Sequence, residues 1–322
     1  MKNNSILIVA GEPNSVFLEI FFKALKTNNF KKSIILIISK DLLLKQMKKL
    51  GFNFQINSIN KKNILYKKLN NKKINIINID YKFKKTFDKI SDNSNKYISE
   101  CFLTALELLK QKNFSGLING PISKKNFLKE KFFGMTEYFA KKTNKKDNAA
   151  MLIYNKKLSV SPLTTHLPLK DVSKAITKKK IINHVKLINK FYREQFKKNP
   201  KIAITGLNPH CESNYRSSEE ERTIKPSIKY LIKKKYKIEG PFAADTIFLK
   251  ELSSKYDVII GMYHDQVLTP IKTLFGFDAI NITLGLPFIR ISPDHGPNHM
   301  MLGKNKSNPQ SLIAAIKFLD KE

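Results

Sequence analysis

The segment that decides the fold runs from Ile6 to Ile38 and reads ILIVAGEPNSVFLEIFFKALKTNNFKKSIILII. It contains an apolar run at Ile6–Ala10, a helical pattern at Phe17–Lys26 and a second apolar run at Ser33–Ile38. Short apolar runs without polar alternation are typical of parallel strands that are buried on both faces. The segment therefore predicts a strand, a helix and a second strand of one parallel sheet.

The alternation of strand and helix continues along the rest of the chain. Short β-branched runs are followed by longer helical patterns, which predicts an α/β fold with helices on both faces of the sheet. The further expected strands are Ile74–Ile77, Gly116–Ile118, Ala149–Tyr154, Leu158–Leu163, Lys201–Thr205 and Val258–Met262, and the further expected helices are Ser94–Lys110, Lys178–Lys197, Glu219–Lys234, Asp245–Ser254 and Asn308–Leu319.

The chain is strongly basic, with 59 Lys+Arg against 26 Asp+Glu and a formal net charge of +33. Such a charge first suggests a nucleic acid or an anionic membrane as partner. Only four of these cations are arginines, the residue type that forks onto phosphates and guanine edges. No apolar run approaches the roughly 20 residues that a bilayer requires. We therefore expect neither a nucleic-acid nor a membrane partner; a basic nucleic-acid-binding surface is the alternative, which steep salt dependence would reveal.

Other features of the sequence indicate a cytoplasmic protein without a standard nucleotide-binding loop. Two cysteines, Cys101 and Cys211, cannot form a disulfide framework, and the apolar core Ile6–Ala10 is short for a secretory signal. No GxGxxG motif follows a strand and no GxxxxGK[ST] motif occurs. A Rossmann dinucleotide site and a P-loop are therefore not indicated.

Three histidines follow predicted strands in segments that are poor in lysine. They are His166 in LTTHLP, His210 in GLNPHC and His264 in GMYHDQ. Functional sites of α/β sheets form at the carboxyl ends of the strands. Three imidazoles with an open coordination position suit a catalytic divalent metal such as Zn²⁺. Because no HxH or HExxH spacing occurs, three unrelated loop residues are the alternative.

Several other polar residues in these segments admit two interpretations. Asp265 could orient a ligand or take a proton, or could only cap a helix. Arg290 lies in the apolar stretch LGLPFIRISP and requires an anionic partner, which could be a ligand or an internal carboxylate. Asn281 could contact a ligand or satisfy backbone groups, and Thr136 could serve an anion site or a helix cap. Lys272 could be a site residue or a surface lysine.

Taken together, these segments resemble the 4-hydroxythreonine-4-phosphate dehydrogenase family of pyridoxal 5′-phosphate (vitamin B6) biosynthesis. The resemblance is carried by TTHLPLKDV, GLNPHCES, GPFAADTIF and YHDQVLTPIKTLFGFDAINITLGLPFIRISPDHG, and it extends over almost the whole chain. It implies a homodimer of two-domain α/β/α subunits of the isocitrate/isopropylmalate dehydrogenase-like type, which bind NAD without the Rossmann glycines. The expected domains are 1–125 with 285–322, and 126–284, the second carrying most metal and substrate ligands.

The resemblance also implies roles for individual residues. One divalent metal ion (Zn, Mg or Co) would bind at the subunit interface. Asp265 and Lys272 would take part in catalysis, while the cofactor-binding residues stay unknown. The implied metal ligands are His166, His210 and His264, and the implied contacts to a small phosphorylated substrate are Thr136, Lys272, Asn281 and Arg290.

The implied reaction is a metal-dependent oxidation with NAD or NADP as cofactor. 4-Phosphohydroxy-L-threonine would be oxidised at C3 and decarboxylated to 3-amino-2-oxopropyl phosphate. Met135 stands where the family usually has histidine before the threonine. A paralogous dehydrogenase of another four-carbon acid phosphate, phosphoerythronate or phosphothreonate, is therefore the alternative. The sequence leaves open the choice between NAD and NADP, the physiological metal and the general base.

Overall fold

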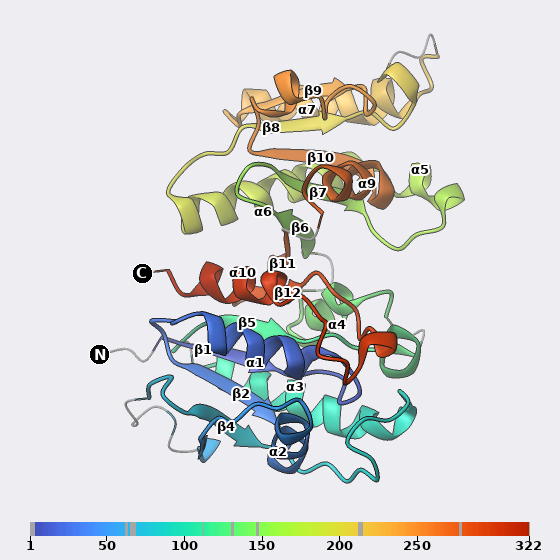
Figure 1. Cartoon of the computed structure of the whole chain (residues 1–322). Helices are drawn as coiled ribbons and strands as arrows, with labels where there is room; N and C mark the ends of the chain where they lie inside the picture. Colours follow the sequence, from blue (N-terminus) through green and yellow to red (C-terminus); the bar gives the residue numbers. More distant parts are fainter. Residues whose placement is uncertain are drawn as a thin grey trace. The chain divides into compact units, whose positions relative to one another are not determined.

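The computed structural model describes residues 4–61, 64, 69–111, 113–129, 132–145, 148–211, 215–276 and 279–321. The chain divides into two compact units (Figure 1). The first unit comprises residues 1–132 and 287–322, and the second comprises residues 133–286. The first unit is therefore discontinuous in sequence, and its last strand and helix follow the whole of the second unit.

The sheet of the first unit has the strand order β3-β4-β2-β1-β5-β12. Every neighbouring pair in this order that the structure describes is parallel. Strands β1 and β2 are fully buried and, apart from Ser5, apolar, as the sequence predicts for a sheet covered on both faces. The strands are β1 (Ser5–Val9), β2 (Ile34–Ile38), β3 (Ile56–Ser58), β4 (Ile74–Asn78), β5 (Phe114–Asn119) and β12 (Arg290–Pro293).

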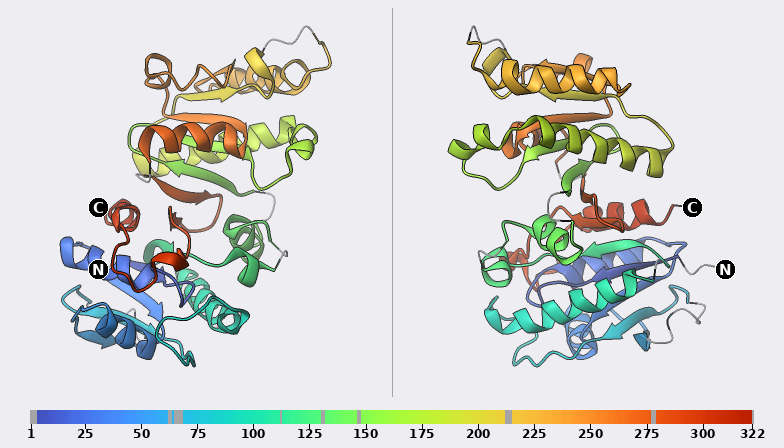
Figure 2. Two further views of the ribbon diagram at one scale, coloured as in Figure 1. Left: turned by 45° about the vertical axis from the view of Figure 1, so that its right-hand side comes forward. Right: turned by 180° about the vertical axis from the view of Figure 1, so that it is seen from behind.

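Helices cover both faces of this sheet. Helix α3 packs on β1, β2 and β5, whereas α1 contacts α2 and α10, and α10 packs on β5 and β12. Views from the front and from behind place α3 on one face and α1 with α10 on the other (Figures 1 and 2). The helices are α1 (Phe17–Thr27), α2 (Lys40–Lys49), α3 (Asn95–Leu109) and α10 (Gln310–Leu319).

The loops that follow β1 and β5 meet closely at Gly120. A Cβ atom at this position would lie 2.0 Å from the carbonyl oxygen of Ala10 and 2.7 Å from Cδ2 of Phe17. Its neighbour across the contact, Gly11, has a φ of +80° and also leaves no room for a side chain. Only glycine allows the two strand ends to approach this closely.

We predict that Gly120→Ala lowers the free energy of unfolding by about 3 kcal/mol, because the backbone must move to admit the methyl group. Urea unfolding followed by circular dichroism measures this change. Gly296→Ala is the matched control in the same unit, since nothing lies within 4 Å of a Cβ atom there. Equal stability of the two variants would contradict the proposed close contact.

The sheet of the second unit has the strand order β11-β6-β7-β10-β8-β9. Strands β7, β10, β8 and β9 are parallel to one another, whereas β6 is antiparallel to both of its neighbours. The strands are β6 (Ala150–Tyr154), β7 (Ser159–Thr164), β8 (Ile202–Thr205), β9 (Ile238–Phe242), β10 (Val258–Tyr263) and β11 (Ile280–Leu284).

Helices also lie on both faces of this second sheet. Helix α9 packs on β7 and β10, while α6 packs on β6, β7 and β11 and contacts α7. Figure 2 shows α9 on one face and α6 with α7 on the other. The helices are α4 (Met135–Lys142), α5 (Val172–Ala175), α6 (Lys178–Phe196), α7 (Lys225–Lys233), α8 (Lys250–Ser253) and α9 (His264–Phe275).

Each strand expected from the apolar runs is present, but two expected helices are shorter. The helix expected over Asp245–Ser254 is wrong for its first half: turns precede α8, because Leu249 has an extended ψ of 139°. The helix expected over Glu219–Lys234 divides into one wide turn, Glu220–Ile224, and α7, which has proline in its first turn. Proline is tolerated there because the first helical N–H groups have no intrahelical partner.

Cys101 and Cys211 are both buried free thiols. Among the described residues, no helix combines the length and the apolar character needed to cross a bilayer.

Candidate functional site

The three predicted metal ligands lie at the carboxyl ends of three neighbouring parallel strands of the second unit, in the order β7-β10-β8. His166 follows the end of β7 by two residues, and His264 opens α9 directly after β10. His210 lies in the short turn Pro209–Cys211, beyond the end of β8. The fold thus brings to one sheet edge three residues that are far apart in sequence.

The backbone at two of these histidines adopts the left-handed conformation. The φ angle is +54° at His166 and +60° at His210. Side chains other than glycine seldom adopt this conformation, although histidine does so more often than most. Such strained positions cluster at functional sites, where surrounding contacts maintain them.

His166 and His264 lie beside each other, with ring centroids 5.8 Å apart. Nδ1 of His264 is 2.7 Å from Oδ1 of Asp265, so the carboxylate holds the ring and leaves Nε2 for another partner. A carboxylate behind an imidazole is a common device for orienting a metal ligand. The capping alternative for Asp265 is not realised, because the N-cap of α9 is Tyr263.

His210 is exposed and does not complete a cluster with the other two histidines. Within the described ranges, no group of three or more His, Cys, Asp or Glu side chains is close enough to hold a metal ion. The structure thus brings together two of the three predicted ligands in one chain. The third lies on the same sheet edge, at the end of β8.

Glu220 fixes the loop that carries His210. Its Oε1 accepts hydrogen bonds from the backbone N–H groups of Leu207 and Asn208 at 2.8 and 2.9 Å, and its Oε2 accepts one from Nδ2 of Asn208 at 2.8 Å. Burial alone would raise the pKa of Glu220, but these hydrogen bonds lower it overall. In the sequence, Glu220 lies near the start of a predicted helix, and this position does not predict its hydrogen bonds to the loop that carries His210.

Gln266 connects the ends of β8 and β10. Its Oε1 accepts from the N–H of Met262 at 2.6 Å and from the hydroxyl of Thr205 at 2.9 Å. Its Nε2 donates to the carbonyl oxygen of Gly206 at 2.8 Å. One side chain therefore fixes the start of the loop that carries His210 and the junction of β10 and α9, where His264 lies.

The predicted substrate contacts Thr136 and Asn281 lie on α4 and β11 of the same unit. The hydroxyls of Thr136 and Thr283 are 3.4 Å apart, and Asn281 shares a face of β11 with Thr283 because two residues separate them. The N-cap of α4 is Gly134, so the capping alternative for Thr136 is not realised. Oδ1 of Asn281 is buried without a hydrogen-bond partner in the described structure.

Glu137 lies next to Thr136, and its importance could not be seen from the sequence. Its Oε1 accepts a hydrogen bond from the hydroxyl of Thr165 at 3.2 Å, while Oε2 is buried and has no hydrogen-bond partner among the described residues. A Cβ atom at Gly134 would lie 2.9 Å from Nε2 of His166 and 3.0 Å from Oε2 of Glu137. The imidazole and the carboxylate therefore converge over a glycine.

The two remaining predicted contacts occupy different settings. Lys272 is exposed near the end of α9. Arg290 begins β12 in the first unit, is only 2% exposed, and donates from Nε to Oδ1 of Asn119 at 2.7 Å. Burial of a guanidinium with a hydrogen bond in place indicates a fixed orientation rather than a surface cation.

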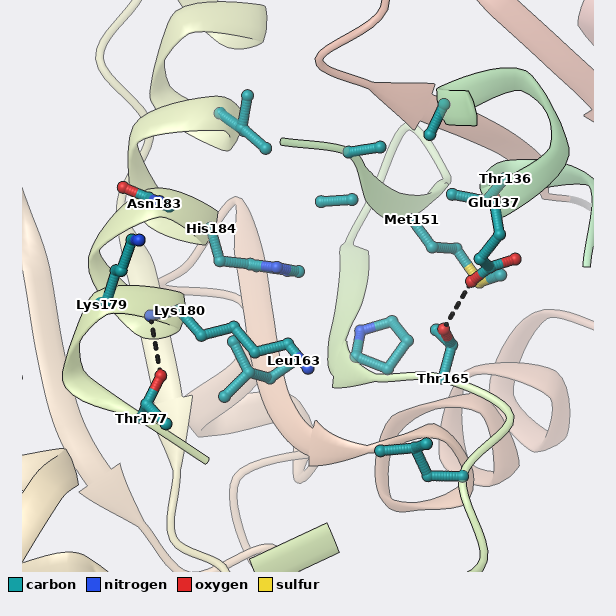
Figure 3. Close-up of a pocket in the computed structure, with 16 residues that line it drawn as sticks. Thr136, Glu137, Met151, Leu163, Thr165, Thr177, Lys179, Lys180, Asn183 and His184 are labelled. Atoms are coloured by element: carbon teal, nitrogen blue, oxygen red, sulfur yellow. Dashed lines mark hydrogen bonds between the residues drawn. The ribbon is translucent and has the colours of Figure 1, made fainter. Parts of the chain in front are cut away.

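A cavity of about 460 Å³ lies between α4, α6 and the strands β6 and β7 (Figure 3). Thr136, Glu137 and Thr165 line one side, and Lys180 and His184 of α6 line the other. Burial lowers the pKa of Lys180. The cavity thus combines apolar walls with a carboxylate and an ammonium group on opposite sides.

Comparison with known proteins connects this arrangement to one family. The family model for the pyridoxal phosphate biosynthetic protein PdxA matches residues 30–319. The chain belongs to the PdxA family. A 4-hydroxythreonine-4-phosphate dehydrogenase from Sulfurihydrogenibium sp. (strain YO3AOP1) is 38% identical over 318 residues, covering 97% of this chain and 96% of the relative. The resemblance found in the sequence motifs is confirmed.

Solved structures confirm the fold class of this PdxA family member. The crystal structure of 4-hydroxythreonine-4-phosphate dehydrogenase from Klebsiella pneumoniae has a TM-score of 0.85 at 24% identity and covers 98% of both chains. Isocitrate dehydrogenase from Methylococcus capsulatus has a TM-score of 0.51 at 8% identity, covering 98% of this chain and 85% of that one. The predicted isocitrate dehydrogenase-like type is therefore correct.

His184 on the cavity wall forms a buried polar chain. Its Nε2 is 2.6 Å from the hydroxyl of Ser161, which donates to the carbonyl oxygen of Met151 at 2.5 Å. Because the serine proton is already donated, Nε2 of the neutral imidazole is the donor to Ser161. Burial, with a smaller effect from the charge of Lys180, lowers the pKa of His184 to about 3.

We predict that the free energy of unfolding decreases as the pH is lowered below about 6.5. In this range the unfolded chain protonates His184 and the folded chain does not. One such proton lowers the free energy of unfolding by up to about 1.4 kcal/mol per pH unit. Urea unfolding at pH 7, 6 and 5 measures the slope, which His184→Gln is expected to reduce. His299→Gln, at an exposed position, should leave it unchanged. An unchanged slope in His184→Gln would refute the prediction.

Proposed function

We propose that this chain oxidises 4-phosphohydroxy-L-threonine at C3 with a nicotinamide nucleotide and decarboxylates the product to 3-amino-2-oxopropyl phosphate. The observation that carries the proposal is the position of His166, His264 and His210 at the carboxyl ends of neighbouring parallel strands. Relatives that align over nearly the whole chain bear the name of this activity, not of the alternative four-carbon acid phosphate dehydrogenase.

The donor set fits a divalent metal ion. Imidazole nitrogens suit Zn²⁺ and similar ions, and the carboxylate of Asp265 behind His264 fixes one ring in the way that such sites require. His166, His210 and His264 would hold the ion. When bound, the ion would supply acidity to the C3 hydroxyl and stabilise negative charge as CO₂ leaves, while the nucleotide would accept the hydride.

The remaining residues of the site would bind and orient the substrate. Thr136 and Asn281 offer a hydroxyl and an amide from the same part of the second unit. Lys272 and Arg290 are the candidates for the carboxylate and the phosphate, since both groups are anionic and arginine pairs well with each. Asp265 would keep His264 in position rather than act on the substrate.

We further propose that the active species is a homodimer with the metal at the subunit interface. This arrangement accounts for three site histidines that do not gather into a three-ligand cluster within the described part of one chain. A second copy of the chain would then complete each site. A cytoplasmic location accords with the two buried free thiols.

We predict that the Co²⁺- or Zn²⁺-loaded protein forms NAD(P)H from 4-phosphohydroxy-L-threonine, that a chelator abolishes the reaction, and that added metal restores it. Asp265→Asn should lower the affinity for the metal by roughly 10- to 100-fold, because the partner that orients the ring of His264 loses its negative charge. Absorbance at 340 nm and calorimetric metal titration measure the two effects. A metal-loaded protein that reduces neither NAD⁺ nor NADP⁺ with this substrate would refute the proposal.

The same assay with phosphoerythronate tests the alternative that Met135 raised from the sequence. Met135 is buried at the start of α4, next to Thr136. The proposal requires a higher kcat/KM for 4-phosphohydroxy-L-threonine than for the hydroxy acid.

A further inference from the structure

Two buried side-chain atoms in the described part of the second unit have no hydrogen-bond partner: Oε2 of Glu137 and Oδ1 of Asn281. Both are acceptors. Leaving a buried acceptor unpaired costs on the order of 1–3 kcal/mol, and more for a charged group. Asn281 is already a candidate substrate contact, and each of these two acceptors would be satisfied by a ligand that presents a hydrogen-bond donor to it.

Glu137 is held in a way that leaves one oxygen available. The hydroxyl of Thr165 donates to Oε1 at 3.2 Å, which fixes the carboxylate while Oε2 has no partner. Oε2 lies 3.0 Å from the position that a Cβ atom would take at Gly134, so a side chain at this position would press against the carboxylate. Figure 3 shows Glu137 and Thr165 on the same side of the cavity.

Neighbouring groups favour an ammonium group as the missing donor. An anionic phosphate or carboxylate would be repelled by Glu137, whereas an ammonium group offers three donors and a compensating charge. Lys180 lines the opposite side of the cavity, and no ion pair joins it to Glu137. The carboxylate of Glu137 and the ammonium group of Lys180 therefore line the cavity without forming an ion pair. This arrangement suits a ligand that carries both a positive and a negative charge.

We propose that Oε2 of Glu137 accepts the ammonium group of the substrate and thereby selects an amino-acid phosphate over the corresponding hydroxy-acid phosphate. This inference rests on the proposed function and names the specificity contact of that site. Nε2 of His166 converges on Gly134 together with Oε2 of Glu137. The carboxylate thus lies beside a proposed metal ligand. This position suits a group that binds the ammonium on C2 of the substrate, next to the C3 carbon that is oxidised.

The decisive experiment measures two ligands on the metal-loaded full-length protein. In Glu137→Gln, the affinity for 4-phosphohydroxy-L-threonine and its kcat/KM should fall roughly 10- to 100-fold, because the ion pair with the ammonium group becomes a hydrogen bond to an uncharged amide. The affinity for phosphoerythronate, which has a hydroxyl in place of the ammonium group, should change less than threefold. Calorimetry gives both affinities, and the reduction of nucleotide gives kcat/KM.

Glu251→Gln is the matched control, since it removes an exposed carboxylate of the same unit and should alter neither ligand. Metal titration of Glu137→Gln separates this role from a structural one. An equal loss for both ligands, a loss of metal affinity, or no loss at all would overturn the inference. If the wild-type protein turns over no 4-phosphohydroxy-L-threonine, the proposed function fails. If it does and the ratio of the two affinities is unchanged in the variant, only the specificity contact fails.

Discussion

The site depends on the side-chain hydrogen bonds that tie together the carboxyl ends of β7, β10 and β8. The hydroxyl of Thr164 donates to the carbonyl oxygen of Met262 at 2.7 Å, and Gln266 links Met262 to Thr205 and Gly206. Loops lack the regular hydrogen bonds of a sheet, so a polar side chain must supply partners for their backbone groups. These bonds fix the strand ends that the three histidines follow.

Acidic residues are scarce in this lysine-rich chain, and two of them in the second unit, Glu220 and Glu137, make specific contacts. Glu220 uses both oxygens on the loop that carries His210. Glu137 uses only one, on Thr165. The difference separates a residue whose role is complete within the protein from one that still requires a donor. The contacts of these two glutamates are more informative about function than the high net charge, which only favours the approach of an anionic substrate.

The sequence allowed eight strands and most helices to be predicted, because apolar runs report burial directly, but β3, β9 and β12 were not expected. It could not reveal that β11 and β6 are antiparallel, because the residue pattern of a strand does not determine which strand it pairs with or in which direction. The histidines were found because each directly follows a strand or lies a short loop beyond it. Glu137 and Glu220 were missed because their roles depend on Thr165 and Asn208, which are distant in sequence. A local sequence pattern cannot show contacts between residues that are distant in sequence.

The discontinuity of the first unit has a consequence for synthesis on the ribosome. Strand β12 pairs with β5, and α10 packs on both, yet these two elements are made only after the whole of the second unit. Until they emerge, the β5 edge of the first sheet has unpaired backbone groups and an uncovered apolar surface. The inserted second unit is synthesised in full before that edge closes. The N-terminal half must therefore wait in an incomplete form, which is when a nascent chain is most exposed to aggregation and to chaperones.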